Sequence, residues 1–178
     1  ITLGEMGYGD DPDETLRGTP MPFVLRDVLA RAGSLKDVKE IIKGSPGTNR
    51  FIFLMSDGKT HDAELYVRDR RRFLVFRPGE EIKVDKNDLK AYPGVVYGGH
   101  YPDRMQSGLD EQYGKITPEL MMKDLIPKFA MRSNFQNVLY APIDLKFWVA
   151  NAAGSEHRAA EQPYTLFDFG TALKAFRS

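Results

Sequence analysis

The sequence predicts an α+β fold built on antiparallel sheet, because its helix-like and strand-like segments come in groups rather than in strict alternation. Two apolar helical stripes lie in succession between residues 21 and 44. Three strand-like segments joined by short turns follow between residues 51 and 76. Short turns suit antiparallel neighbours, whereas parallel strands need long crossovers. The continuously apolar segment 51–55 favours two layers of sheet enclosed by helices.

The first predicted elements are a short strand, a loop and a helix. Residues 1–3 are apolar enough for a strand, and residues 4–20 are rich in glycine and acidic side chains, which is typical of a loop. Pro22 fits the first turn of a helix. The expected buried face of this helix repeats every three or four residues and consists of Leu25, Val28, Leu29 and Ala32.

A second helix is expected to begin after Ser34, whose hydroxyl can cap it, with Asp37 three residues further on. Its apolar stripe consists of Leu35, Val38 and Ile42.

The pattern then changes to that of an antiparallel meander. Residues 63–67 alternate between polar and apolar side chains, and residues 73–76 are apolar again. Asp57-Gly58 supplies the backbone conformations of a hairpin turn, and residues 70–72 are expected to form the next turn. Residues 83–90 are polar and predict a loop.

In the second half of the chain, residues 95–97 predict a short buried strand. Thr117-Pro118-Glu119 predicts a helix start, with threonine as the cap and proline at the first position. Residues 135–140 and 145–150 predict a second hairpin, and residues 164–167 a last strand.

The composition excludes several classes of protein and site. The 178 residues carry 25 basic and 25 acidic side chains, and this balance gives no reason to expect binding to nucleic acid. The sequence has no apolar run of the roughly 20 residues that a membrane helix needs. It contains no cysteine, and His61 and His157 lack the spacing of metal ligands. We therefore expect no metal, no cofactor and no thiolate nucleophile within this chain.

Several motifs resemble, in order along the chain, those of cysteine-dependent N-terminal nucleophile (Ntn) hydrolases of the penicillin acyltransferase-like branch, which is related to the choloylglycine hydrolases. Ile1-Thr2-Leu3-Gly4-Glu5-Met6-Gly7 looks like the segment after that family's central strand. Gly18-Thr19-Pro20-Met21-Pro22-Phe23 looks like its first downstream helix. The paired strands, late helix and hairpin of the family are matched by residues 45–80, 113–117, 136–140 and 148–152.

The resemblance implies a four-layer αββα sandwich of which this chain, residues 1–178, supplies the C-terminal portion of a single domain. In such enzymes an N-terminal cysteine, freed by autoproteolysis, attacks an amide carbonyl, and its own amino group acts as the base. The family's cysteine lies upstream of the segments matched in this chain. The expected function is therefore part of an amide-bond hydrolase or acyltransferase that acts on a small amide or acyl substrate.

Five residues are candidates for substrate binding: Glu5, Asn49, Tyr97, His100 and Arg104. Glu5 follows the first strand and precedes glycines, and Asn49 precedes a strand, where a turn amide is the alternative. His100 follows two glycines and suits proton transfer, although a loop histidine is equally consistent. Tyr97 can line a pocket or simply pack against neighbouring side chains. Arg104 can bind a substrate carboxylate or be exposed to solvent.

Two other functions are compatible with the sequence. The chain can be a catalytically silent fragment or a binding module that keeps the fold, or a self-sufficient domain that is not an enzyme. The Ntn interpretation further expects an apolar sheet that is completed by an upstream segment or by self-association. The sequence does not indicate a cellular compartment.

Overall fold

The computed structural model describes residues 1–7, 11–84 and 87–177, and the chain divides into two compact units, Ile1–Gly99 and His100–Ser178. Both units combine helices with an antiparallel sheet, so the predicted α+β class is confirmed. Each unit is described on its own below. The acidic cluster of the predicted first loop includes Asp10, which lies outside the described residues.

The first unit is built on a four-stranded antiparallel sheet in the order β1-β2-β3-β4. The strands are β1 (Thr2–Gly7), β2 (Phe51–Asp57), β3 (Asp62–Arg68) and β4 (Phe73–Phe76). The predicted meander is therefore confirmed, while the first strand extends four residues past its expected end. The β2–β3 turn is tight, and His61 adopts a positive φ of 61° in it.

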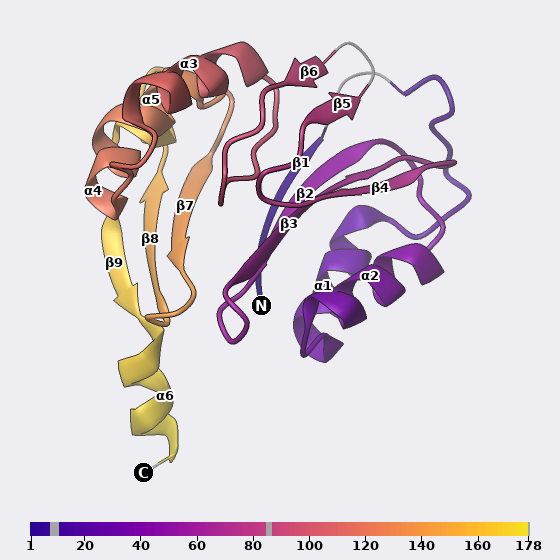
Figure 1. Ribbon diagram of the computed structural model, residues 1–178. Helices are drawn as coiled ribbons and strands as arrows, with labels where there is room; N and C mark the ends of the chain where they lie inside the picture. The colour runs from indigo at the N-terminus through magenta and orange to yellow at the C-terminus, as the bar shows by residue number, and fades with distance from the viewer. Residues whose placement is uncertain (8–10, 85–86, 178) are drawn as a thin grey trace. The chain divides into compact units, whose positions relative to one another are not determined.

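Helices α1 (Met21–Arg31) and α2 (Leu35–Gly44) cover one face of this sheet, as Figure 1 shows. The Ser34 hydroxyl accepts a hydrogen bond from the Asp37 N–H and donates one to the Asp37 carboxylate, which confirms the predicted cap.

The core between these helices and the sheet contains apolar side chains from both layers. The buried members are Met21, Val24, Val28, Leu35, Val38, Ile42, Phe53, Met55 and Tyr66. The predicted stripe of α2 is confirmed, but that of α1 is partly wrong, because Leu29 is 63% exposed. The buried face of α1 is rotated toward Met21 and Val24, which the predicted stripe did not include.

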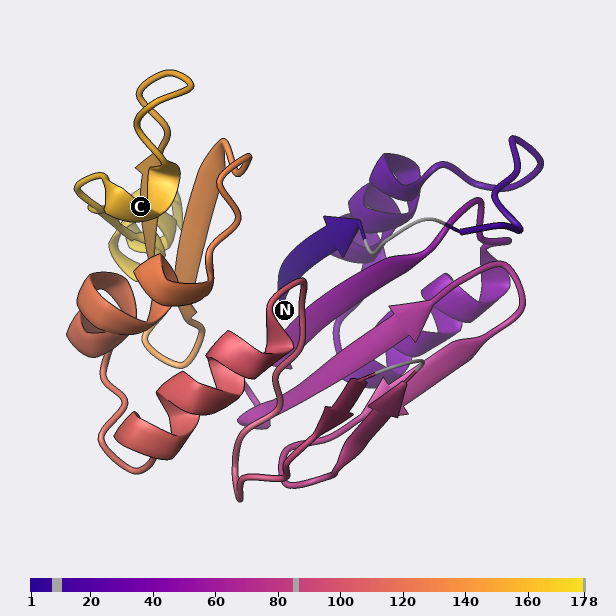
Figure 2. The same ribbon diagram turned by 90° about the horizontal axis from the view of Figure 1, so that it is seen from above.

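The other face of the sheet is covered in part by a short hairpin, β5 (Ile82–Val84) and β6 (Asn87–Leu89), which Figure 2 shows on the opposite side from the helices. Ile82, Val84 and Leu89 pack there against Leu65 and other apolar side chains of the sheet. The predicted loop over residues 83–90 is therefore wrong in its described part.

The strand predicted over residues 95–97 is also absent. Only Val95 forms a β-bridge, with Tyr92, and the following residues are irregular although partly buried. The apolar side chains that suggested a strand pack instead as a covering segment over the sheet.

The helices that precede the sheet of the second unit are α3 (Pro102–Gln112), α4 (Pro118–Leu120), the π-helical turn η1 (Met121–Leu125) and α5 (Ile126–Phe129). The last three run without a break, and Thr117 caps them by accepting a hydrogen bond from the Leu120 N–H. Pro127 has no N–H and crowds the carbonyl four residues before it. A wider π turn just before that proline relieves this conflict, since the Ile126 N–H bonds to the carbonyl of Met121.

The sheet of the second unit has three antiparallel strands, β7 (Gln136–Ala141), β8 (Lys146–Asn151) and β9 (Thr165–Asp168), in the order β7-β8-β9. The predicted hairpin and last strand are thus confirmed. Tyr140, Phe147 and Phe167 are paired across the three strands, so their rings lie on one face, with centroids 6.1 Å and 4.9 Å apart.

The chain then turns directly from β9 into helix α6 (Phe169–Arg177), which Figure 1 shows as a continuation of the strand. A single 3-10 turn, η2 (Ala159–Glu161), precedes β9 and contributes Ala160 to a small core with Ile126 and Ala130.

Candidate functional site

The five candidate residues from the sequence are divided between the two units. Glu5, Asn49 and Tyr97 belong to the first unit, and His100 and Arg104 to the second. The surroundings of each side chain show which of them are free to meet a ligand.

Glu5 lies in β1 opposite Phe53 and therefore shares the helix-covered face of the sheet. The residue as a whole is exposed, but partial burial of its carboxyl group raises the pKa of Glu5 above its ordinary value. Partial burial thus disfavours the ionised form of Glu5 relative to that of a fully solvated carboxyl group.

Asn49 stands at the end of a turn that is fixed by backbone hydrogen bonds. The Thr48 carbonyl accepts from the Thr15 N–H at 2.8 Å, and the Asn49 side-chain oxygen accepts from the Thr48 hydroxyl at 3.0 Å. The amide oxygen of Asn49 therefore already accepts one hydrogen bond, and its NH2 group provides two donors.

Glu5 and Asn49 are not brought together along the sheet. Phe53, the partner of Glu5, is four residues from Asn49, which corresponds to roughly 13 Å along an extended strand. A ligand that touched both residues would have to span this distance.

Tyr97 has a packing role in the first unit. Its hydroxyl donates to the Lys90 carbonyl at 3.0 Å, and its ring meets that of Tyr92 edge-on at 5.8 Å. These contacts favour the structural interpretation of Tyr97.

His100 and Arg104 flank the start of α3 in the second unit. The Arg104 guanidinium lies over the ring of Tyr101, 4.6 Å from its centroid, and the arginine side chain is exposed. His100 is half-buried and precedes Tyr101, the residue before the helix.

A pocket that the sequence did not predict lies in the second unit, where α6 begins beside the β7–β8 turn. The turn is held to the helix by the Leu145 carbonyl, which accepts from the N–H groups of Phe169 at 2.9 Å and Gly170 at 3.2 Å. Leu145 itself has a positive φ of 53°, a conformation that a leucine adopts at some cost.

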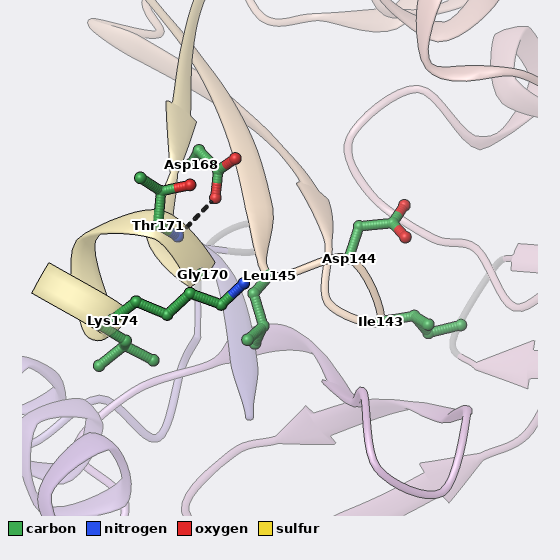
Figure 3. Close-up of a pocket in the computed structure, with 8 residues that line it drawn as sticks. Ile143, Asp144, Leu145, Asp168, Gly170, Thr171 and Lys174 are labelled. Atoms are coloured by element: carbon green, nitrogen blue, oxygen red, sulfur yellow. Dashed lines mark hydrogen bonds between the residues drawn. The ribbon is translucent and has the colours of Figure 1, made fainter. Parts of the chain in front are cut away.

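Asp168 closes one side of this pocket by capping α6. One oxygen of its carboxylate accepts from the Thr171 N–H at 2.8 Å, as the dashed line in Figure 3 shows. This backbone hydrogen bond, together with the nearby charges of Lys146 and Lys174, lowers the pKa of Asp168 below its ordinary value. Asp168 is therefore an ionised structural group.

The pocket has a volume of about 420 Å³ and combines opposite charges with apolar side chains. Its lining consists of Ile143, Asp144, Leu145, Asp168, Gly170, Thr171, Leu173 and Lys174. The sequence contained one signal of this arrangement, because Asp168 followed by Thr171 is a helix-cap spacing. The sequence pattern predicted a last strand over residues 164–167 and no helix after it.

The described residues contain no cluster of three or more histidine, aspartate or glutamate side chains that could hold a metal ion. Among those same residues, no helix combines the length and apolar character needed to cross a membrane. No protein-family model matches the chain, and comparison with curated proteins finds no significant match.

Proposed function

We propose that this chain is part of an Ntn-type amide hydrolase or acyltransferase whose cysteine nucleophile lies on an upstream segment. The observation that carries the proposal is that each unit combines an antiparallel sheet with helices, which are the components of the αββα sandwich implied by the sequence motifs. In this proposal the chain supplies the C-terminal portion of a single four-layer domain.

The chemistry assigned to this chain is substrate binding rather than nucleophilic attack. The chain has no cysteine, so the thiolate and the amino group that activates it must come from the upstream segment. Asn49 is the best-prepared residue for contact with a substrate carbonyl, because its side-chain oxygen is already engaged by Thr48 and its amide group is a donor. Glu5, with its raised pKa, is assigned a hydrogen bond to the substrate.

His100 and Arg104 remain proposed substrate-binding residues of the second unit. Tyr97 is assigned a packing role within the first unit, since its hydroxyl and ring are both engaged. The substrate class is a small amide or acyl compound, and nothing in this proposal requires a metal or another cofactor.

The upstream segment is proposed to pair with the outer edge of β1. This strand stands at one end of the sheet order, and no strand in the described part of the chain pairs with its other side. A second copy of the chain is the alternative partner for the same edge.

Hydrolysis of small anilides tests the proposal. The natural protein that includes the upstream segment should release the aromatic amine, and replacement of its N-terminal cysteine by alanine should abolish the release. The 178-residue chain alone should release none. Turnover by the chain alone would contradict the proposal. Substrate binding without turnover by the natural protein would favour the silent binding module instead.

A further inference from the structure

We propose that the pocket between α6 and the β7–β8 turn binds a small zwitterion with an apolar side chain, such as a free branched-chain amino acid. This inference uses residues of the second unit alone and does not depend on the proposed amide chemistry.

The charges at the pocket favour a ligand that carries both signs. Figure 3 shows the Lys174 ammonium and the Asp144 carboxylate on different sides of Leu145. Within the described residues, the Asp144 carboxylate makes no hydrogen bond or ion pair, so it is available to accept from a ligand's ammonium group. Lys174 can donate to a ligand's carboxylate.

The charged groups that line the pocket carry both signs. Asp168 is committed to the cap of α6 and faces Lys146 and Lys174. A purely anionic ligand would meet the carboxylates of both Asp144 and Asp168, and a purely cationic one would meet Lys174. A ligand with both an ammonium group and a carboxylate can place each of them beside an opposite charge.

The apolar side chains of the pocket supply a place for an aliphatic group. Ile143 and Leu145 are 59% and 46% exposed, and Leu173 completes this lining. A bound aliphatic side chain would cover part of that surface, with a gain of about 25 cal/mol per Å² of apolar area. The volume of about 420 Å³ suits a small ligand.

The backbone around the pocket is held in place before any ligand arrives. The Leu145 carbonyl accepts two N–H groups from the start of α6, and its positive φ directs the chain back from the turn into β8. A pocket that is already formed loses less conformational entropy when it binds.

Titration of the isotope-labelled chain with L-leucine, followed by NMR, tests this inference. L-Leucine should shift the amide signals of Leu145 and Thr171 with a millimolar Kd. Leucinamide lacks the carboxylate, N-acetyl-leucine lacks the ammonium group and glycine lacks the side chain. Each should therefore bind at least about fivefold more weakly than L-leucine.

Three variants make the test specific to the pocket. Asp144→Asn and Lys174→Met should each weaken L-leucine binding about fivefold, which is the upper end expected for one exposed charge contact. Lys115→Met removes an exposed charge elsewhere in the second unit and should leave binding unchanged. The inference is overturned if L-leucine shifts neither signal at 50-fold excess over the ~1 mM expected Kd. It is also overturned if all four ligands bind equally, or if Asp144→Asn and Lys174→Met bind like the parent chain.

Discussion

Tyr66 donates its phenolic hydrogen to the carboxylate of Glu64 at 2.6 Å, in the layer between the first sheet and its helices. The two residues are two apart in β3 and therefore share a face. Lys39 of α2 donates to the same carboxylate at 2.9 Å, and the Arg77 Nε lies 3.4 Å from it. A buried carboxylate is thus compensated by donors from both layers, and the contact with Lys39 ties α2 to the sheet.

Replacement of Tyr66 by phenylalanine should destabilise the fold by about 1.5–3 kcal/mol, the usual cost of a lost hydrogen bond to a charged group. The aromatic packing against Phe73, at 5.4 Å between centroids, is retained, so the loss reports the hydroxyl group. Urea denaturation followed by circular dichroism measures it. A loss below about 0.5 kcal/mol would show that the bond to Glu64 is not stabilising.

Tyr164→Phe is the matched control for that experiment. The Tyr164 hydroxyl is also buried, but it has no hydrogen-bond partner within the described residues, and burial raises its pKa. Its removal should leave the free energy of unfolding unchanged or raise it by about 1 kcal/mol. A loss as large as that of Tyr66→Phe would mean that both effects come from general disruption of packing.

The surroundings of Asp69 predict that the fold loses stability in acid. Burial alone would raise its pKa, but hydrogen bonds from the Arg72 side chain and from the N–H groups of Arg72 and Arg71 outweigh this, and the pKa of Asp69 lies below its ordinary value. A lowered folded-state pKa stabilises the fold above the unfolded value of about 3.9. This contribution should disappear as the pH falls below about 4.

The comparison of Asp69→Asn with the parent chain isolates this effect. The difference in unfolding free energy between the two should be large at pH 6 and should shrink toward pH 2. Asp103→Asn, at an exposed position of α3, serves as the control and should show a small difference throughout. A difference for Asp69→Asn that stays constant over this pH range would refute the assignment.

Two glycines of the first unit should respond in opposite directions to replacement by alanine. A Cβ on Gly18 would lie 2.8 Å from the Pro46 carbonyl oxygen, a backbone atom that cannot move without breaking the contact between two loops. We expect Gly18→Ala to cost about 1–3 kcal/mol, as overpacking does.

Gly44→Ala is the opposite case, because nothing lies within 4 Å of the added Cβ and the residue ends helix α2. Alanine should stabilise the chain there by about 0.5–1 kcal/mol. Thermal unfolding of both variants measures the contrast, and equal melting temperatures would show that the loop contact at Gly18 is not constrained.

The elements that the sequence predicted well are those with strong local signals. Ser34 caps its helix as expected, because a cap needs only the residues of its own turn. The β2–β3–β4 meander and the β7–β8 hairpin also follow from local alternation and short turns.

The elements that the sequence missed depend on contacts that are distant in the chain. Helix α3 has few apolar residues and packs through Gly108, where an added Cβ would come within 2.9 Å of Leu125. Phe176 of helix α6 is 95% exposed, so the apolar residues of this helix do not mark a single buried face. Residues 95–97 form no strand, although they are apolar. Val96 and Tyr97 pack over the sheet instead.

The candidate site shows the same limit. Asn49 could be selected from its position before a strand. The hydrogen bond from the Thr48 hydroxyl to its side-chain oxygen could not be predicted in this way. The engagement of Tyr97 with Lys90 and Tyr92 could not be read from a single tyrosine. The pocket at α6 joins residues 143–145 to residues 168–174, and no local pattern connects these two segments.

The most direct measurement of the central proposal is the intact mass of the natural protein after reaction with an aryl ester of a small carboxylic acid. Attack by a thiolate on the ester carbonyl expels the phenolate and leaves a thioester, which adds one acyl group to the protein. The account predicts a single acyl adduct on an N-terminal cysteine upstream of Ile1, and none on the 178-residue chain alone. A natural protein whose mature N-terminus is not cysteine, or an adduct within residues 1–178, would contradict it.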